Sequence, residues 1–485
     1  MLLGLLALSF VLRGALALSG GQRFFPDENR YLRCFILLRH LERADLRGAL
    51  DEVLVNPDHT GFLAVGLVPA TVQRLALKAL GMPQARPTVD ATAWLPALIL
   101  SLCSVACIGL VGSIARRAGG SDAEGLLAAL LMACSTVMLF YSRHLLPYDA
   151  ALALALFAVY LGLVEHASWR RSLLVGLVAG SAFLTYNGYW LVALAALALH
   201  CFYGAPPLRQ VLRRGATAGL GFTALPALLT ASSLARGKGL YVRRLLRFSR
   251  GAATQADFSE GWSLPWEYLW HAEHLLLIVL AAGAAAVLWL AARRDGAARS
   301  RGLLFLGAAA GMYAVMVVGS IGFERIGTFG RLSRSLVPFL CLATACAGAR
   351  WITARRSVAW AALLALAAQA GFNFATPLRQ RFPREVAREL EVAFGELGRD
   401  TSVRVDQSPE EKPLTDERHV LLNARYLYPV YGPKPAPEGR VLFRTPHPQE
   451  YLPYQYEGLV PGERALLRST DVSMRLIDTR PDGAR

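Results

Sequence analysis

Charged side chains are scarce in this chain, and their scarcity indicates its class. Only 18% of the 485 residues are charged, whereas 54% are hydrophobic. Soluble globular domains carry about 25% charged residues. Here the charges are nearly missing from repeated apolar runs that approach the ~20 residues a helix needs to cross a bilayer. The composition therefore excludes an ordinary soluble domain and predicts a polytopic α-helical membrane protein.

The chain also lacks N-x-Ser/Thr sequons, internal repeats and low-complexity linkers, and lysine is scarce beside arginine. These features favour a bacterial inner membrane over an endoplasmic reticulum. The seven cysteines are an odd number, and most lie in apolar runs, where we expect small packing residues. Those within predicted spans are Cys103, Cys107, Cys134, Cys201, Cys341 and Cys346.

About eleven transmembrane helices are predicted from hydropathy and flanking charge. Their segments cover residues 1–19, 91–115, 125–141, 148–164, 173–186, 188–203, 215–235, 272–292, 302–322, 335–349 and 357–375. The membrane domain is therefore expected to occupy 1–375, with a first outer loop at 20–90 and a second large outer loop at 236–271.

Alternate connections between these spans are rich in arginine. Cytoplasmic loops carry an excess of Lys and Arg, so these connections are predicted to be cytoplasmic. The N-terminus is then inside, whereas both large loops and the tail after Phe374 are outside. The arginines are Arg116, Arg117, Arg170, Arg171, Arg209, Arg213, Arg214, Arg293, Arg294, Arg299, Arg301, Arg350, Arg355 and Arg356.

The first apolar run has a cleaved signal peptide as its alternative interpretation. Ala15, Leu16 and Ala17 resemble a small-x-small cleavage site. However, the run lacks a basic n-region, and Arg13 interrupts it. We therefore predict that it remains as a transmembrane helix.

The net charge of +16 belongs mainly to the membrane part, because basic and acidic residues roughly balance after Thr376. Much of the excess is the arginine of the connections, so no nucleic-acid partner is predicted. Residues 376–485 are expected to form a small extracytoplasmic soluble α/β domain. Its helix is predicted at 383–397, and its short strands at SVRVD (402–406), RHVLLNA (418–424), RVLFR (440–444) and MRLID (474–478).

Ionisable residues are nearly missing from the predicted spans, which argues against a transporter, because transporters place such groups near the midplane. The unusual polar residues instead cluster at the predicted outer side. This placement predicts an active site at the outer membrane interface, acting on a substrate that is itself partly lipid. The residues are Asp27, Glu28, Asp58, His59, Arg143, Asp149, Arg331 and Arg334.

The first outer loop contains two amphipathic segments, 29–50 and 62–80, whose apolar surfaces and spaced basic residues are typical of helices in the headgroup plane. They are expected to hold Asp27 and Glu28 against the bilayer. The alternative is that one of these two carboxylates caps the helix that follows.

Several site residues have plain structural alternatives. Asp58 and His59 either orient an acceptor, ligate a metal or hydrogen-bond within their loop. Asp149 belongs to the same predicted acceptor or metal site, and its alternative role is that of N-cap for its span. Aromatic residues at span ends are expected to be interface anchors. Solvated residues at a helix end are expected, rather than a zinc site, for His271, Glu273 and His274.

Five motifs follow one another along the membrane part: PDENRY (26–31), NPDHTGF (56–62), FYSRHLLPYDAALALAL (140–156), VGLVAGSAFLTYNGYWL (175–191) and RSLVPFL (334–340). Their order resembles that of the GT-C glycosyltransferases, specifically the polyprenyl-phosphate-sugar-dependent group with protein O-mannosyltransferases and the lipid A aminoarabinose transferase. The resemblance covers about 1–375, with Thr60-Gly61 where two prolines are usual and Tyr186 in place of a lysine. These departures leave donor and acceptor open.

The resemblance implies a membrane glycosyltransferase and assigns the base to Asp27, with Glu28 as its helper. Sugar transfer from a polyprenyl phosphate needs a carboxylate that takes the proton of the acceptor hydroxyl. The departing phosphate gathers negative charge, so arginines or a divalent cation must bind it. Arg143 and Arg334 are the candidate arginines. Direct displacement by one acceptor predicts inversion at the anomeric carbon. No cofactor is assigned, and a divalent cation stays open.

The second outer loop begins with RGKGLYVRRLLRFSR (236–250), which predicts a basic amphipathic helix. Its position outside opposes the charge rule, so we expect a function for its charges. Arg243, Arg244 and Arg247 are predicted to bind the phosphate of the lipid donor at its entrance. The following aromatic residues are expected to form either a rim or a mobile lid at the same interface: Trp262, Trp266, Tyr268 and Trp270.

Two other classes of function stay open. A non-enzymatic flippase or exporter of lipid-linked saccharides would place its charges inside the membrane. An O-antigen ligase-like enzyme or a phosphoethanolamine-type transferase would act without this donor. The expected partners are a lipid-linked sugar donor, membrane lipids, and a glycan, lipid or protein acceptor.

Overall fold

The computed structural model describes residues 1–20, 22, 28, 30–55, 57, 60–82, 90–253, 262–293, 296–323, 330–354, 356–379, 403–405, 440–444 and 475–478. The first half of this part contains α1 (Leu2–Leu18), α2 (Arg30–Glu42), α3 (Leu46–Val55), α4 (Thr60–Ala79), α5 (Asp90–Arg117), α6 (Asp122–Ala133), α7 (Thr136–Tyr141), α8 (Tyr148–Gly162), α9 (Trp169–Thr185), the 3-10 helix η2 (Asn187–Tyr189) and α10 (Trp190–Phe202).

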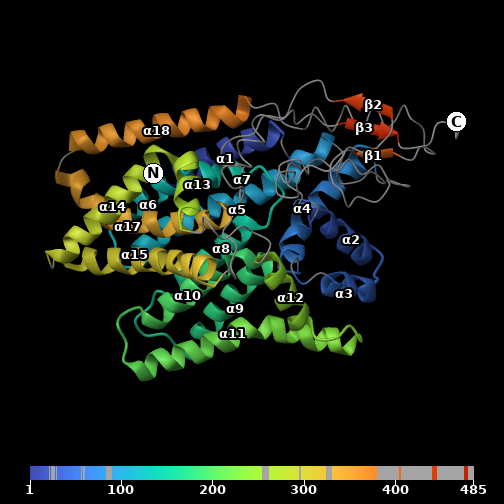
Figure 1. Cartoon of the computed structure of the whole chain (residues 1–485), viewed down its shortest axis with the longest axis horizontal. Helices are drawn as coiled ribbons and strands as arrows, with labels where there is room; N and C mark the ends of the chain where they lie inside the picture. Colours follow the sequence, from blue (N-terminus) through green and yellow to red (C-terminus); the bar gives the residue numbers. More distant parts are fainter. Residues whose placement is uncertain are drawn as a thin grey trace.

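The second half continues the helical architecture and ends in three strands (Figure 1). It contains α11 (Leu208–Ala235), α12 (Tyr241–Ala253), α13 (Leu264–Glu273), α14 (Leu275–Ala292), α15 (Gly296–Val317), the π-helix η3 (Val318–Gly322), α16 (Gly330–Ser333), the 3-10 helix η4 (Arg334–Leu336), α17 (Val337–Ala354), α18 (Arg356–Arg379), β1 (Val403–Val405), β2 (Arg440–Arg444) and β3 (Arg475–Asp478).

Six helices in the described part of the chain are long and apolar enough to cross a membrane. They lie in α4, α5, α11, α14, α15 with η3, and α16 to α17. Shorter apolar helices lie in α1, α8, η2 with α10, and α18. The prediction of an α-helical membrane protein is confirmed. By length and composition α4 also qualifies, although the sequence predicted an interfacial helix there.

The predicted span 125–141 is wrong as one continuous helix. It is broken into α6 and α7, because Ser135 accepts a hydrogen bond from the Met138 amide at 3.4 Å and thereby starts a new helix. This break matters for the site, because α7 is a six-residue helix whose C-terminus leads directly into Arg143.

Arginine-bearing connections gather at one end of the helical bundle, as their mutual contacts show. Arg117 lies 4.7 Å from the ring of Tyr160, and Arg171 donates to the Leu161 carbonyl. The other contacts join further connections to the same end: Arg214 donates to the carbonyls of His200 and Tyr203, and Arg301 pairs with Glu124 at 2.9 Å. These four connections therefore lie together at one end of the bundle.

The opposite end of the long axis carries α2, α3 and α12 (Figure 1). Here α2 packs on α4, where the Tyr31 hydroxyl donates to Gln73 at 3.0 Å. Elsewhere in the bundle α1 packs on α5, and the buried Arg13 donates to the Ser104 hydroxyl at 2.9 Å. In the described chain α1 is thus a packed helix whose arginine is fixed by hydrogen bonds.

Close packing in the bundle depends on small residues, most clearly between α9 and α11. A Cβ added to Gly176 would lie 1.9 Å from the Ala218 carbonyl oxygen, and one added to Gly180 would lie 2.5 Å from the Phe222 carbonyl oxygen. Helices in membranes associate through such small-residue faces, because lipid provides no hydrophobic drive between them. The Gly-x-x-x-Gly spacing thus sets the approach of these two helices.

Three of the four predicted C-terminal strands are confirmed, and they pair in the order β1-β3-β2. Both pairings are antiparallel, with Val403 opposite Asp478 and a register irregularity between Val441 and Phe443. In Figure 1 the strands lie toward the same end as α2 and α3. The fourth predicted strand, 418–424, and the predicted helix 383–397 lie outside the described residues.

Candidate functional site

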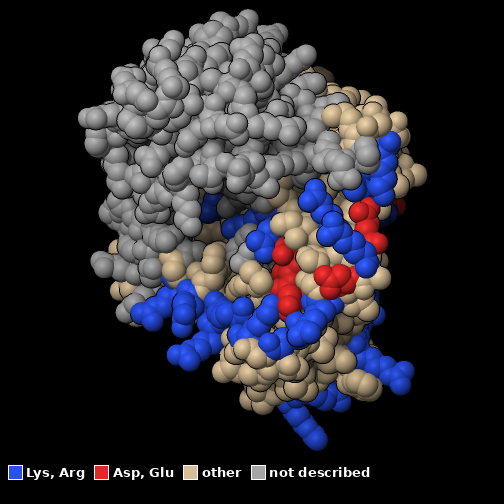
Figure 2. Space-filling view, turned by 90° about the vertical axis from the view of Figure 1, so that its right-hand side faces the viewer, with Lys and Arg blue, Asp and Glu red and all other residues tan. Residues whose placement is uncertain are grey.

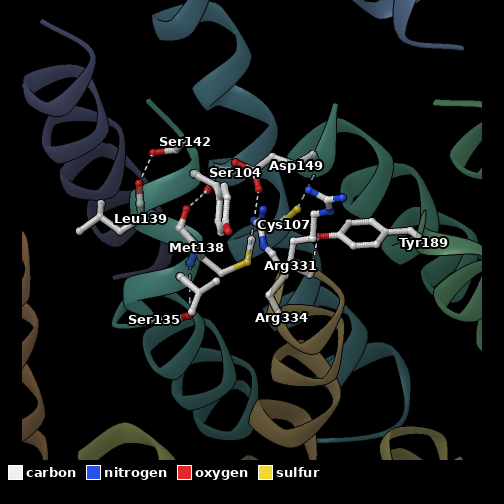
Figure 3. Close-up of polar contacts among 12 residues, drawn as sticks. Ser104, Cys107, Ser135, Met138, Leu139, Ser142, Asp149, Tyr189, Arg331 and Arg334 are labelled. Carbon is white, nitrogen blue, oxygen red and sulfur yellow. Dashed lines mark hydrogen bonds and ion pairs between the residues drawn. The ribbon is translucent and has the colours of Figure 1, made fainter. Parts of the chain in front are cut away.

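A buried ion pair joins Asp149 in the first turn of α8 to Arg334 at the start of η4. One guanidinium nitrogen of Arg334 contacts a carboxylate oxygen of Asp149, and the same nitrogen lies 3.1 Å from the sulfur of Met138. Arg334 is 0% exposed. Figure 3 shows Asp149, Met138 and Arg334 meeting at this point. The N-cap of α8 is Pro147, so the alternative of Asp149 as N-cap is wrong, and its carboxylate instead holds an arginine.

Buried tyrosines line this ion pair. The guanidinium carbon of Arg334 lies 4.8 Å from the ring centroid of Tyr141, a distance that allows a cation–π contact. The Tyr141 hydroxyl lies 3.1 Å from that of Tyr268. Tyr148 contacts both Tyr141, at 5.5 Å between ring centroids, and Tyr189, at 6.4 Å. The prediction that aromatic residues at span ends are interface anchors is therefore wrong for these tyrosines.

Arg331 lies one turn before Arg334 and takes part through its backbone. The Tyr189 hydroxyl donates to the Arg331 carbonyl at 3.4 Å, and Figure 3 labels both residues beside the ion pair. The side chain of Arg331 is half-buried. The structure thus brings Asp149, Arg331 and Arg334 together, as the sequence predicted.

Arg143 follows the C-cap of α7 and is 0% exposed. Its guanidinium carbon lies 6.0 Å from the ring centroid of Phe140. Gln22, in the segment after α1, donates to the Arg143 carbonyl at 3.3 Å and to the Ala17 carbonyl at 2.8 Å. The segment after α1 is therefore fixed at Gln22 against the segment that carries Arg143.

Glu28 makes a second attachment between the same two segments. Its carboxylate accepts from the Leu145 amide at 2.8 Å and lies 3.1 Å from Nδ1 of His144. Glu28 is 3% exposed and His144 is 1% exposed. His144 was not singled out from the sequence, because only the folded loop brings it to Glu28. Asp27 precedes Glu28 in the chain and lies outside the described residues.

Asp58 and His59 also lie outside the described residues, whereas their neighbours Pro57 and Thr60 are fixed. The hydroxyl of Tyr241, at the start of α12, donates to the Pro57 carbonyl at 3.0 Å and lies 2.7 Å from the Thr60 hydroxyl. The start of α12 is therefore attached to the turn between α3 and α4.

The predicted basic amphipathic helix is confirmed as α12. Tyr241 and Leu245 are buried, while Arg243 and Arg247 are exposed. Arg244 is half-buried and donates to the Ser233 hydroxyl at 2.9 Å and to the Val55 carbonyl at 3.5 Å; the apolar cluster under α12 comprises Leu54, Leu184, Tyr241 and Leu245. Arg243 and Arg247 therefore face outward, whereas Arg244 joins α12 to the ends of α3 and α11.

A salt-bridge cluster fixes the segment before α12 to α3. Asp51 pairs with Arg236 at 2.7 Å and with Lys238 at 2.8 Å. The hydrogen bond from Arg236 and the one from Lys238 hold the pKa of the Asp51 carboxyl well below its usual range. Figure 2 shows this end of the molecule, where Lys and Arg side chains gather around a smaller number of acidic ones. In the sequence alone Asp51 does not stand out, because its two cationic partners lie about 185 residues away.

The expectation of solvated residues at 271–274 is wrong for Glu273, which is 0% exposed, whereas His271 and His274 are exposed. Among the residues that the structure describes, no group of three His, Cys, Asp or Glu side chains is placed to hold a metal ion. The alternative of a metal at Asp58 and His59 falls outside that part of the chain.

Comparisons with known proteins add no relative. No family model and no curated protein matches this chain.

Proposed function

We propose that this protein is a GT-C-type glycosyltransferase that transfers a sugar from a polyprenyl-phosphate or polyprenyl-diphosphate donor to a cell-envelope acceptor. The acceptor is a glycan, lipid or protein at the outer face of a bacterial inner membrane. One observation supports the proposal: Glu28, which follows Asp27 in the chain, is bonded to His144 and Leu145, the two residues after the buried Arg143. In this proposal Asp27 is the base and Arg143 binds the phosphate.

In this proposal Asp27 removes the proton of the acceptor hydroxyl as the oxygen attacks the anomeric carbon. The bond from that carbon to the phosphate oxygen breaks, and the product sugar is inverted. Arg143 and Arg334 bind the charge that gathers on the leaving phosphate, because aimed cationic donors stabilise developing negative charge strongly in a site sheltered from water. Asp149 orients Arg334, and a divalent cation is a further possible source of charge.

The preference for an enzyme over a flippase or exporter comes from what the buried charges contact. The burial of Arg13 in the apolar helix α1 favours the transport alternative, because transporters place charged residues inside the membrane. However, Arg13 is bonded to the Ser104 hydroxyl and the Ser9 carbonyl, which fix α1 to α5. Arg334, which is paired with Asp149, contacts Met138 and Tyr141 of α7, the helix that precedes Arg143, and in this proposal the lipid-linked donor binds there.

The proposal includes eleven spans, a cytoplasmic N-terminus and an extracytoplasmic α/β domain over 376–485. The arginine-rich end of the bundle would face the cytoplasm, since positive charge is retained there. We expect a reporter that is active only after export to be active when it is fused after residue 400. A reporter signal typical of the cytoplasm at that position would contradict this orientation and the outer-face site with it.

The exposed arginines of α12 are proposed to raise the local concentration of the anionic donor. A surface arginine contributes about 1 kcal/mol of attraction to an anionic headgroup. Changing both Arg243→Gln and Arg247→Gln should therefore raise the donor KM by roughly 30-fold, with little change in kcat. The measurement is steady-state transfer in nanodiscs at varied donor concentration.

A matched control exists at the opposite end of the bundle, where Arg209 and Arg213 are also exposed on one helix. Arg209→Gln with Arg213→Gln removes the same charge and should leave the donor KM unchanged. Equal KM values for the α12 variant and the wild type would leave α12 as a plain headgroup anchor.

The experiment that tests the function itself is mass spectrometry of envelope lipids and glycans from cells with and without the gene. A component that carries an additional sugar only when the gene is present supports the proposal.

A further inference from the structure

A buried glutamate forms an N-terminal clamp on α7, the short helix that precedes Arg143. Oε1 of Glu273 accepts from the Ser135 hydroxyl at 2.5 Å and from the Val137 amide at 3.1 Å, and Oε2 accepts from the Thr136 amide at 2.8 Å. The first amides of a helix have no partner within it, and a buried one must find an acceptor elsewhere. Glu273 provides that acceptor from α13.

The other end of α7 is held by the same helix. Tyr268 of α13 lies with its hydroxyl 3.1 Å from that of Tyr141, the last residue of α7. Two residues of α7, Met138 and Tyr141, contact Arg334. The orientation of α7 therefore sets two of the surfaces against which the guanidinium of Arg334 rests.

Helix α18 joins the same cluster from the end of the membrane part. Gln369 donates to the Glu273 carbonyl at 2.5 Å, and Asn373 donates to the Thr136 hydroxyl at 2.7 Å. Both residues lie four apart on one face of α18, so one helix touches both halves of the clamp. The last helix before the C-terminal region is thereby bonded to the helix that leads into Arg143.

We infer that Glu273 is a positioning residue for the transfer reaction, which acts through α7 on Arg334 and Arg143 without contacting substrate. This inference rests on the proposed function for its kinetic part alone. Glu273 is not a solvated helix-end residue and not a metal ligand in this account. Glu273 and Asn373 both hydrogen-bond to Thr136 and thereby join α13 and α18 to α7.

The test uses the full-length protein in nanodiscs and the variant Glu273→Gln, in which an NH₂ group that cannot accept replaces one carboxylate oxygen. At least one amide among those of Thr136 and Val137 then loses its acceptor. Amide hydrogen exchange of the peptide that covers α7 should rise at least tenfold, while exchange in α8 and α9 stays unchanged. In the same protein kcat should fall about tenfold with the donor KM unchanged.

The control is Glu124→Gln, a second buried carboxylate, which pairs with Arg301 at the arginine-rich end of the bundle. It should leave exchange in α7 and kcat at wild-type values. Unchanged α7 exchange in Glu273→Gln would overturn the inference, as would a rise of exchange throughout the bundle, which indicates general destabilisation.

If Glu273→Gln does not fold, Asn373→Ala decides the matter by the same measurement. It removes only the bond to the Thr136 hydroxyl and should raise α7 exchange by a smaller factor; no rise there overturns the inference. Exchange needs no substrate, so a wild-type protein without transferase activity would contradict the proposed function and leave the exchange result to judge the clamp.

Discussion

Replacing Arg334 by alanine is expected to lower kcat by roughly 10²–10³-fold, the usual cost of losing one donor to developing charge. The side chain is fully buried and paired with Asp149, so its loss also leaves a buried carboxylate without its partner. Removing one member of a buried pair costs about 3–5 kcal/mol of stability. Transfer rates and thermal unfolding of the variant in nanodiscs measure the two effects.

A second variant separates the catalytic effect from the loss of stability. Arg334→Gln combined with Asp149→Asn replaces the ion pair by two neutral amides, so no unpaired charge stays buried and much of the stability should be recovered. The rate should stay low, because the cationic group has gone. A double variant that is stable and turns over at the wild-type rate would show that the pair is only structural.

Asp27→Asn is expected to lower kcat by roughly 10²–10⁴-fold, the range for removal of a general base. The change is nearly isosteric, and the bonds that fix the loop are made by Gln22 and Glu28. The variant should therefore fold and insert normally. Turnover with the saturating donor and acceptor, compared with the melting temperature, provides the measurement.

Glu28→Gln is the matched control for Asp27→Asn. It keeps one acceptor for the Leu145 amide but loses the carboxylate beside His144, so we expect reduced stability of the loop and partial activity. If Glu28→Gln abolished transfer while Asp27→Asn kept it, the base would be assigned to the wrong acid.

The long apolar runs made much of the fold predictable from sequence. Bilayer-spanning helices need about twenty apolar residues, and such a run is readable without any tertiary contact. Only part of the break between α6 and α7 is encoded locally, in the N-cap residue Ser135. The carboxylate that accepts from the Thr136 amide comes from Glu273, 137 residues away, and a local pattern contains no information about such a partner.

The candidate site was predictable in its charges and not in its surroundings. Arg143, Asp149 and Arg334 stand out as rare charges beside apolar runs. The tyrosines around them do not, since they come from four separate segments and resemble the aromatic residues of a membrane interface. Similarly, the amphipathic pattern identified α12 but could not divide its arginines, because Arg244 is held by Val55 and Ser233 only in the folded chain.

The proposed function requires that the protein transfers a sugar onto an envelope component with Asp27 as the base. Its most direct test is mass spectrometry of envelope lipids, glycans and proteins from three strains: one without the gene, one with the wild-type gene and one with Asp27→Asn at equal protein level. The account predicts one component that gains the mass of a sugar residue in the wild-type strain alone. Identical envelopes in all three strains, or an equal gain with Asp27→Asn, would contradict it.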